Sequence, residues 1–254
     1  MNKLLGQHFL KDKAVAKKMV VLASLKEGER VLEIGPGRGA LTEKLLEKKI
    51  KIIAVEKDPK LVDFLKERFS GEKNLEIVTG DILKLYPQIA ADLGEFKIIA
   101  NIPYYLTGRL LRLLTENRPK PEKTILMIQK EVARRLAARP PKATLLSVLL
   151  QFYGEAKVEF LVPAEKFSPP PKVDSAVVQI NLSDKFSREL EKTFLMILKT
   201  GFRQPRKTLR NNLSTLLKGD KAEAEKRMSD SGLRENQRAQ ELSLEDWVKL
   251  ANEF

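Results

Sequence analysis

Short apolar runs alternate with amphipathic segments from residue 31 to 182, and this order restricts the fold more than any other feature. Helices are expected at 41–48, 59–69, 107–115, 130–138 and 145–152. Buried strands are expected at 31–34, 50–55, 75–78, 98–100, 124–128, 158–162 and 175–182. Such alternation builds a parallel sheet covered by helices on both faces, so the sequence predicts an α/β fold. Only a proline-rich loop separates the last two strands, which suits a terminal antiparallel pair.

The character of the sequence changes after Ser183. Charged helices are expected at 189–200, 206–217, 221–230 and 244–253, with glycine-centred breaks between them and no strand pattern. We therefore predict two domains, an α/β catalytic domain over residues 1–182 and a small helical domain over residues 183–254.

A formal charge of +13 and an isoelectric point near 9.7 predict a polyanionic partner. The cations cluster: the segment 118–142 holds eight of them with two acids, and the segment 199–210 has no acid. Its cations are Lys199, Arg203, Arg206, Lys207 and Arg210. Neither cluster is accompanied by a strongly apolar face, so nucleic acid is favoured over a membrane surface. Arg203, Arg206, Lys207 and Arg210 are the predicted RNA-binding residues.

Several classes of function are disfavoured by what the chain lacks. It has no cysteine and one histidine, so neither a thiolate nucleophile nor a His or Cys metal cluster is expected. No apolar run is long enough to span a membrane, and the first residues lack the pattern of a secretory signal. We expect a cytoplasmic protein without a metal, and a monomer.

A glycine-rich turn follows the first predicted strand in the segment 33–40 and opens a helix. Gly35 and Gly37 allow a ligand to approach the backbone closely, which indicates a nucleotide-like cofactor. Glu56, which ends the next strand, is placed to bind ribose hydroxyls. Asp81, after the third strand, is placed to accept from an adenine amino group, with Ile82 packing on the ring, although Asp81 alone is also typical of a helix cap.

The segment Asn101-Ile102-Pro103-Tyr104-Tyr105 follows a buried strand and is suited to holding a planar amine for alkylation. The exocyclic amine of adenine is a poor nucleophile because its lone pair is delocalised into the ring. The Asn101 side-chain oxygen and a backbone carbonyl next to Pro103 can accept its two N–H groups, while Tyr104 stacks on the ring. The segment predicts methyl transfer to a nucleobase.

The glycines alone also satisfy a dinucleotide-binding pattern, so a nicotinamide-dependent dehydrogenase is an alternative. Hydride transfer leaves the segment 101–105 and both basic clusters without a role. A sulfonium methyl donor explains them together, so S-adenosylmethionine is the preferred cofactor.

Taken together, these motifs resemble the ribosomal RNA adenine dimethyltransferases, in particular the bacterial small-subunit type. The resemblance runs from residue 6 to about 214. It is carried by the segments 6–10, 31–42, 80–82, 101–105, 129–133, 167–177 and 206–213. The block with three prolines and the segment 206–213 are its most specific parts.

The resemblance implies a class I S-adenosylmethionine-dependent methyltransferase with a Rossmann-like, seven-stranded sheet whose last strand is reversed, and a C-terminal helical domain that grips rRNA. It implies that His8, Leu10, Gly35, Glu56, Asp81 and Asn101 line the cofactor site. It also implies that Phe167 stacks on the target adenine opposite Tyr104. The expected function is dimethylation of adenosines in small-subunit rRNA or a pre-ribosomal particle.

Three positions depart from the pattern of this family. His8 stands where the family often has asparagine, and Ala143-Thr144 replaces a usual aromatic-glycine pair. Ile102 replaces the usual leucine and is shared with the antibiotic-resistance methyltransferases of large-subunit rRNA, which are the nearest rival to the small-subunit type. The sequence is also compatible with a ribosome-assembly factor whose binding matters more than its chemistry, and with a methyltransferase acting on DNA adenine or a glutamine side chain.

Overall fold

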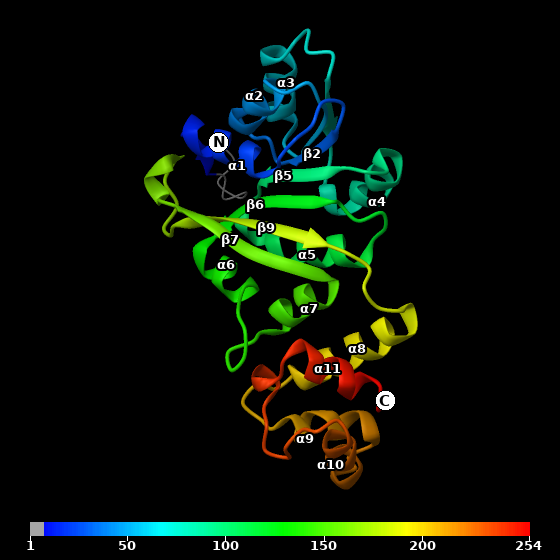
Figure 1. Cartoon of the computed structure of the whole chain (residues 1–254). Helices are drawn as coiled ribbons and strands as arrows, with labels where there is room; N and C mark the ends of the chain where they lie inside the picture. Colours follow the sequence, from blue (N-terminus) through cyan, green and yellow to red (C-terminus); the bar gives the residue numbers. More distant parts are fainter. Residues whose placement is uncertain (1–7) are drawn as a thin grey trace. The chain divides into compact units, whose positions relative to one another are not determined.

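The computed structural model describes residues 8–254 and divides the chain into two compact units (Figure 1). The first unit contains the residues up to 133 together with 156–183. The second contains 134–155 together with 184–254. A helix and a strand cross the divisions: α6 (Lys130–Leu136) and β7 (Gly154–Val162).

The first unit is built on a seven-stranded sheet with the order β4-β3-β2-β5-β6-β9-β7. Strands β2 to β6 run parallel to one another, and β9 runs antiparallel to β6. The expectation of a seven-stranded sheet with a reversed last strand is therefore confirmed. Besides β7, its strands are β2 (Arg30–Ile34), β3 (Lys51–Glu56), β4 (Leu75–Thr79), β5 (Lys97–Asn101), β6 (Lys123–Gln129) and β9 (Ser175–Leu182).

Helices cover both faces of this sheet. Val31 and Leu32 point to opposite faces of β2, and neither is exposed to solvent. On one face, Val31 belongs to a core cluster with residues of α1 and α2. The helices of the unit are α1 (Lys13–Leu22), α2 (Ala40–Leu46), α3 (Pro59–Arg68), α4 (Ile82–Leu93) and α5 (Thr107–Glu116). Of these, α4 falls in a segment to which the sequence patterns assigned no structure.

The strand order reverses direction between β2 and β5. The chain builds β2, β3 and β4 outward and then crosses back to place β5 on the other side of β2. A crevice opens at the carboxyl ends of the strands where such a reversal occurs. Asn101, at the end of β5, and the glycine turn after β2 are therefore brought to one place.

A separate two-stranded element lies at this crevice. β1 (Phe9–Leu10) pairs antiparallel with β8 (Phe167–Ser168), so that Leu10 faces Phe167 in the register. The backbone N–H of Lys11 donates to the carbonyl of Lys166 at 3.0 Å and extends the pairing. The Gly6-Gln7 part of the N-terminal motif lies outside the described residues.

The second unit is helical, as predicted, but it includes a segment that the sequence analysis placed in the first domain. Its helices are α7 (Leu145–Tyr153), α8 (Arg188–Gly201), α9 (Leu209–Leu213), α10 (Lys221–Asp230) and α11 (Leu244–Ala251). The expected helix at 206–217 is divided into α9 and a short 3-10 helix, Ser214–Leu217. Helix α7 packs on α8 and α11, and the Phe152 ring stacks on Phe194 with centroids 4.0 Å apart. This aromatic packing explains why residues 134–155 group with the C-terminal helices. No helix within residues 8–254 is long and apolar enough to cross a membrane.

Gly201, the last residue of α8, offers a test of packing in the second unit. A Cβ built there would lie 2.4 Å from the ring of Trp247, which is fully buried. Gly201→Ala should lower the free energy of unfolding by about 1–3 kcal/mol, the usual cost of overpacking. The control is Gly108→Ala in α5, where a Cβ meets nothing within 4 Å. Chemical denaturation should find this control neutral or slightly stabilised; equal effects of the two substitutions would contradict the described packing.

Candidate active site

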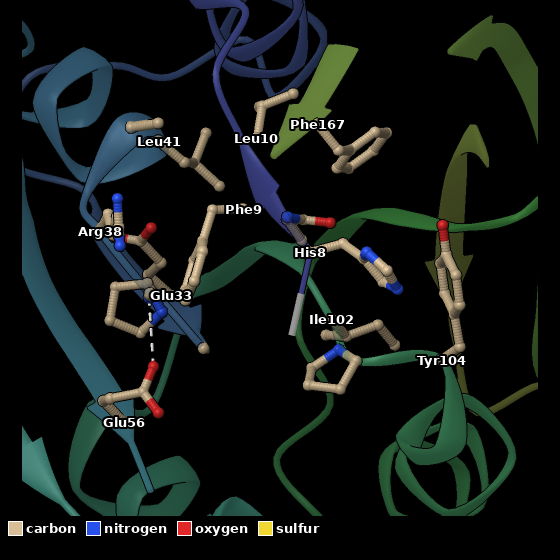
Figure 2. A pocket seen from close by; sticks show the side chains of 16 residues that line it. His8, Phe9, Leu10, Glu33, Arg38, Leu41, Glu56, Ile102, Tyr104 and Phe167 are labelled. Carbon is tan, nitrogen blue, oxygen red and sulfur yellow. Dashed lines mark hydrogen bonds between the residues drawn. The ribbon is translucent and has the colours of Figure 1, made fainter. Parts of the chain in front are cut away.

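A pocket of about 760 Å³, open to solvent, lies in the crevice between β2 and β5 (Figure 2). Five parts of the chain line it: the segment 8–10, the end of β2 with the glycine turn and the start of α2, Glu56 at the end of β3, the turn after β5, and Phe167 of β8. The sequence-predicted residues in its wall are His8, Leu10, Gly35, Gly37, Glu56, Asn101, Pro103, Tyr104 and Phe167.

A second pocket, of about 610 Å³, adjoins the first. Gly35, Glu56 and Pro103 line both pockets. The second pocket also contains the remaining two predicted cofactor residues, Asp81 and Ile82. All predicted cofactor and catalytic residues therefore lie around two neighbouring pockets in the first unit.

Glu56 is held in place by backbone N–H groups. Its Oε1 accepts from the N–H groups of Lys57 at 2.8 Å and Asp58 at 3.0 Å, and its Oε2 accepts from Gly37 at 3.1 Å. Only 7% of the residue is exposed. Since a carboxylate oxygen can accept two hydrogen bonds, Oε2 keeps a lone pair for a ligand hydroxyl.

The glycine turn depends on a backbone conformation that side chains disfavour. Gly37 has φ +59°, and a Cβ there would lie 3.0 Å from the ring of Phe9. A side chain at this position would be strained and would press on β1. The guanidinium of Arg38 also packs on the Phe9 ring, 4.9 Å from its centroid.

Asp81 caps helix α4 and also lines the second pocket. Its Oδ1 accepts from the N–H of Leu83 at 3.0 Å and caps α4, and Oδ2 pairs with Lys57 Nζ at 2.9 Å. The Lys57 hydrogen bond is the main cause that lowers the pKa of Asp81, so the group is charged at neutral pH. Ile82 is 5% exposed and lines the same pocket.

Glu33 is a site residue that the sequence analysis did not select. It lies at the base of the first pocket and is 1% exposed. Its Oε2 accepts from Thr42 Oγ1 at 2.8 Å, whereas Oε1 is buried and has no partner among the described residues. Burial, with a smaller contribution from the charge of Glu56, raises the pKa of Glu33 to about 8. The available signal was an acid inside an otherwise apolar strand, Val31-Leu32-Glu33-Ile34.

The turn after β5 presents its polar groups to the first pocket. The side chain of Asn101 has no hydrogen-bond partner among the described residues, and Pro103 begins a 3-10 turn, Tyr104–Leu106. The carbonyl of Pro103 accepts from the N–H of Leu106 at 2.9 Å. Within residues 8–254 the carbonyl of Ile102 accepts no hydrogen bond. It is therefore the backbone carbonyl next to Asn101 that can accept a hydrogen bond from a ligand.

Aromatic side chains form the other wall. The Tyr104 hydroxyl hydrogen-bonds Ser175 Oγ at 2.9 Å, and burial raises the pKa of Tyr104. The Phe167 ring lines the pocket but is 2% exposed and belongs to the core cluster with Leu10. The ring that lies beside Tyr104 is that of His8, with centroids 6.1 Å apart. Stacking of the target base between Tyr104 and Phe167 stays a prediction.

The predicted RNA-binding residues lie in the second unit and fall into two groups. Arg203, Arg206 and Lys207 are exposed in the loop between α8 and α9. Asn212 fixes this loop, because its Nδ2 donates to the carbonyls of Gly201 at 2.9 Å and Gln204 at 3.1 Å.

Arg210 differs from the other three. Its Nη1 lies 2.7 Å from Glu225 and 2.9 Å from Glu235, and Glu225 is the main cause that raises its pKa. These carboxylates neutralise the guanidinium. Arg210 therefore joins α9 to its neighbours and is poorly placed to bind a phosphate, which the spacing of cations in the sequence did not indicate.

Comparison with known sequences decides the family. The profile of the family described as "Ribosomal RNA adenine dimethylase" matches residues 1–254. The chain belongs to this family. It is similar to the ribosomal RNA small subunit methyltransferase A of Dehalococcoides mccartyi, with 40% identity over the whole chain and 88% of that protein. The protein of the same name from Thermosynechococcus vestitus is also 40% identical, over 98% of this chain and 95% of its own length.

Solved structures show the same fold. A dimethyladenosine transferase from Plasmodium falciparum superposes with a TM-score of 0.81 and 27% identity, covering 96% of both chains. The 23S rRNA methyltransferase ErmE gives a TM-score of 0.77 and 25% identity, covering 96% of this chain and 98% of its own. The fold is therefore that of the class I methyltransferases. The protein is an rRNA adenine dimethyltransferase, and its methyl donor is S-adenosylmethionine.

The raised pKa of Glu33 predicts how stability depends on pH without a ligand. In the folded protein Glu33 stays protonated up to about pH 8, whereas in the unfolded chain its carboxyl group loses the proton near pH 4.5. The stability of the wild type should therefore fall as pH rises from about 4.5 to 8, by a few kcal/mol in order of magnitude. Glu33→Gln removes this dependence and keeps an acceptor for Thr42, so its stability relative to wild type should increase with pH over this range.

Urea denaturation at several pH values measures this difference. Glu72→Gln, at an exposed turn, is the matched control and should show no trend. A constant difference between Glu33→Gln and wild type from pH 5 to 8 would show that Glu33 is not buried as described.

Proposed function

We propose that the protein transfers methyl groups from S-adenosylmethionine to the exocyclic amino groups of adenosines in small-subunit rRNA, giving dimethyladenosine, during biogenesis of the small ribosomal subunit. The observation that carries the proposal is full-length similarity, at 40% identity, to proteins named as small-subunit methyltransferases. The arrangement of the two pockets supports the chemistry.

The residues around the pockets fit the donor, which combines an adenosine with a cationic methionine end. Oε1 of Glu33 is buried and unpaired, and the donor's ammonium group would supply a cationic partner that stabilises the ionised carboxylate, so Glu33 would give up its proton when the donor binds. Glu56 would bind the ribose hydroxyls through the free lone pair of Oε2. Asp81 and Ile82 would hold the adenine in the second pocket. When bound, the donor supplies an electrophilic methyl group.

The turn after β5 would hold the amine to be methylated. The free side chain of Asn101 and the free carbonyl of Ile102 are two acceptors for the two N–H groups of the adenine amine. Accepting both hydrogens draws the nitrogen towards a tetrahedral geometry and localises its lone pair. The amine attacks as a neutral group, so positioning supplies most of the acceleration.

Tyr104 would hold the extruded base. The bond between its hydroxyl and Ser175 fixes the ring, and Pro103 fixes the backbone before it. Fixed aromatic rings are suited to stack on a base that has left its helix. Phe167 would complete the pocket from β8.

The loop that carries Arg203, Arg206 and Lys207 would bind rRNA phosphates. The bonds of Asn212 hold its backbone, so less conformational entropy is lost when the loop binds. The substrate would be rRNA within a pre-ribosomal particle in the cytoplasm, and the enzyme would act as a monomer.

One observation favours a second candidate. Ile102 lines the first pocket and is shared with large-subunit rRNA methyltransferases, and ErmE superposes over 96% of this chain. Incubation with labelled donor and, separately, immature small subunits, mature small subunits and large-subunit rRNA tests both. Mapped dimethyladenosine in immature small subunits is expected, whereas label only in large-subunit rRNA would select the second candidate. Tight binding without label would indicate an assembly factor.

Asn101→Ala should reduce methyl transfer by roughly 10²–10³-fold or more, because it removes an acceptor that acts on the reacting amine. The affinity for the donor should change little, since Glu33, Glu56 and Asp81 remain. Single-turnover transfer and donor binding by calorimetry measure the two effects. The control is Asn74→Ala at an exposed turn of the same unit. Normal turnover by Asn101→Ala would remove the proposed role.

A double substitution, Arg206→Ala with Lys207→Ala, should weaken RNA binding. It should also reduce the slope of log affinity against log salt by about one to two, because up to two phosphate contacts are lost. The control is Lys221→Ala with Lys226→Ala, two exposed lysines of α10. An unchanged slope in the first variant would exclude the loop from the RNA interface.

A further inference from the structure

His8, the one histidine of the chain, is fixed in the wall of the first pocket. It immediately precedes β1, and the pairing of β1 with β8 holds its backbone. Figure 2 shows the imidazole of His8 pointing toward Tyr104, above Ile102 in this view. The rings of His8 and Tyr104 have centroids 6.1 Å apart and an interplanar angle of 30°.

The hydrogen bond of His8 determines which ring nitrogen carries the proton. Nδ1 lies 2.8 Å from the carbonyl oxygen of Pro169. A carbonyl oxygen can only accept, so Nδ1 must be the donor, and in a neutral imidazole Nε2 then carries the lone pair. Nε2 has no hydrogen-bond partner among residues 8–254. The neutral ring therefore presents an unused proton acceptor on the side away from Pro169.

We propose that Nε2 of His8 accepts the proton that the target amine loses on methylation; this inference rests on the proposed function. The lone pair of the adenine amine forms the new C–N bond, and the C–S bond breaks with its electron pair going to sulfur. The nitrogen would then carry a positive charge. One of its two N–H groups leaves its acceptor in the turn after β5, and its proton passes to Nε2. The resulting imidazolium keeps its bond to Pro169 and later releases the proton to solvent.

The remaining titratable groups at the pocket are less suited to this step. The Tyr104 hydroxyl is held by Ser175, and Oε1 of Glu56 already accepts two hydrogen bonds. The two oxygens that stay available, Oε1 of Glu33 and Oε2 of Glu56, are the ones that the proposed function assigns to the donor's ammonium group and ribose hydroxyls. Arg38 lies on Phe9, and Asp12, just after β1, is paired with Lys166. Asp174, whose charge acts on Tyr104, is paired with Lys130.

Two variants separate proton acceptance from a structural role. His8→Asn keeps an N–H donor for the Pro169 carbonyl but has no ring nitrogen that can accept a proton. Its single-turnover rate at saturating donor should fall by about tenfold or more. This effect is smaller than that of most general bases, because the amine attacks before its proton leaves. The dissociation constant for RNA should stay within about twofold of wild type, and saturating donor removes any effect on donor binding, since His8 also lines the cofactor pocket.

The pH dependence is the decisive readout. The wild type and His8→Asn should differ in how the rate depends on pH, because only the wild type has a ring nitrogen that can accept a proton at this position. Added imidazole should restore the rate of His8→Ala, more strongly at higher pH. A His8→Asn profile with the wild-type pH dependence, or a full rate in this variant, would overturn the inference. If the wild type itself transfers no methyl group to rRNA adenosines, the proposed function fails instead.

Discussion

The carboxylate of Glu56 joins the parts on which the site depends. It accepts from the N–H of Gly37 in the turn after β2 and from two N–H groups in the turn that follows β3. Two strand ends are thereby tied together by one buried charge, with Glu56 in the wall of both pockets. Because its charge is already satisfied by three fixed donors, little reorganisation is needed when a ligand hydroxyl binds.

The sheet order gives this interaction its functional meaning. The reversal between β2 and β5 places Asn101 beside the glycine turn, although the two are far apart in the sequence. One strand end offers acceptors for a cationic donor, and the other offers acceptors for a neutral amine. In the proposed function the two reactants would be held by neighbouring rigid elements, so that positioning would supply most of the acceleration.

Much of this arrangement could be predicted from the sequence, because it depends on local patterns. Alternating apolar runs located all seven strands of the sheet, and Glu56 and Asp81 were identified by their positions after strands. The reversed last strand was indicated by the short proline-rich loop before it and implied by the family resemblance. The strand order was not predicted, since periodicity does not specify which strands pair.

The features that were missed depend on long-range packing or on pairs of side chains. Arg210 was selected as a cation, but its neutralisation by Glu225 and Glu235 depends on how the helices of the second unit pack. The unpaired oxygen of Glu33 and the bond from His8 to Pro169, 161 residues apart, are equally invisible to periodicity. Segment 134–155 was misplaced because an apolar helix such as α7 gives no sign of which core it joins.

The central claim is that one crevice holds the donor and the target amine on its two sides. A crystal structure with a bisubstrate analogue, in which the donor is linked to the amino nitrogen of an adenosine, tests it most directly. We expect the donor's ribose on Glu56, its adenine beside Asp81, and the linked nitrogen within hydrogen-bond distance of Asn101 and the Ile102 carbonyl. An analogue bound elsewhere, or an Asn101 side chain turned away from that nitrogen, would contradict it.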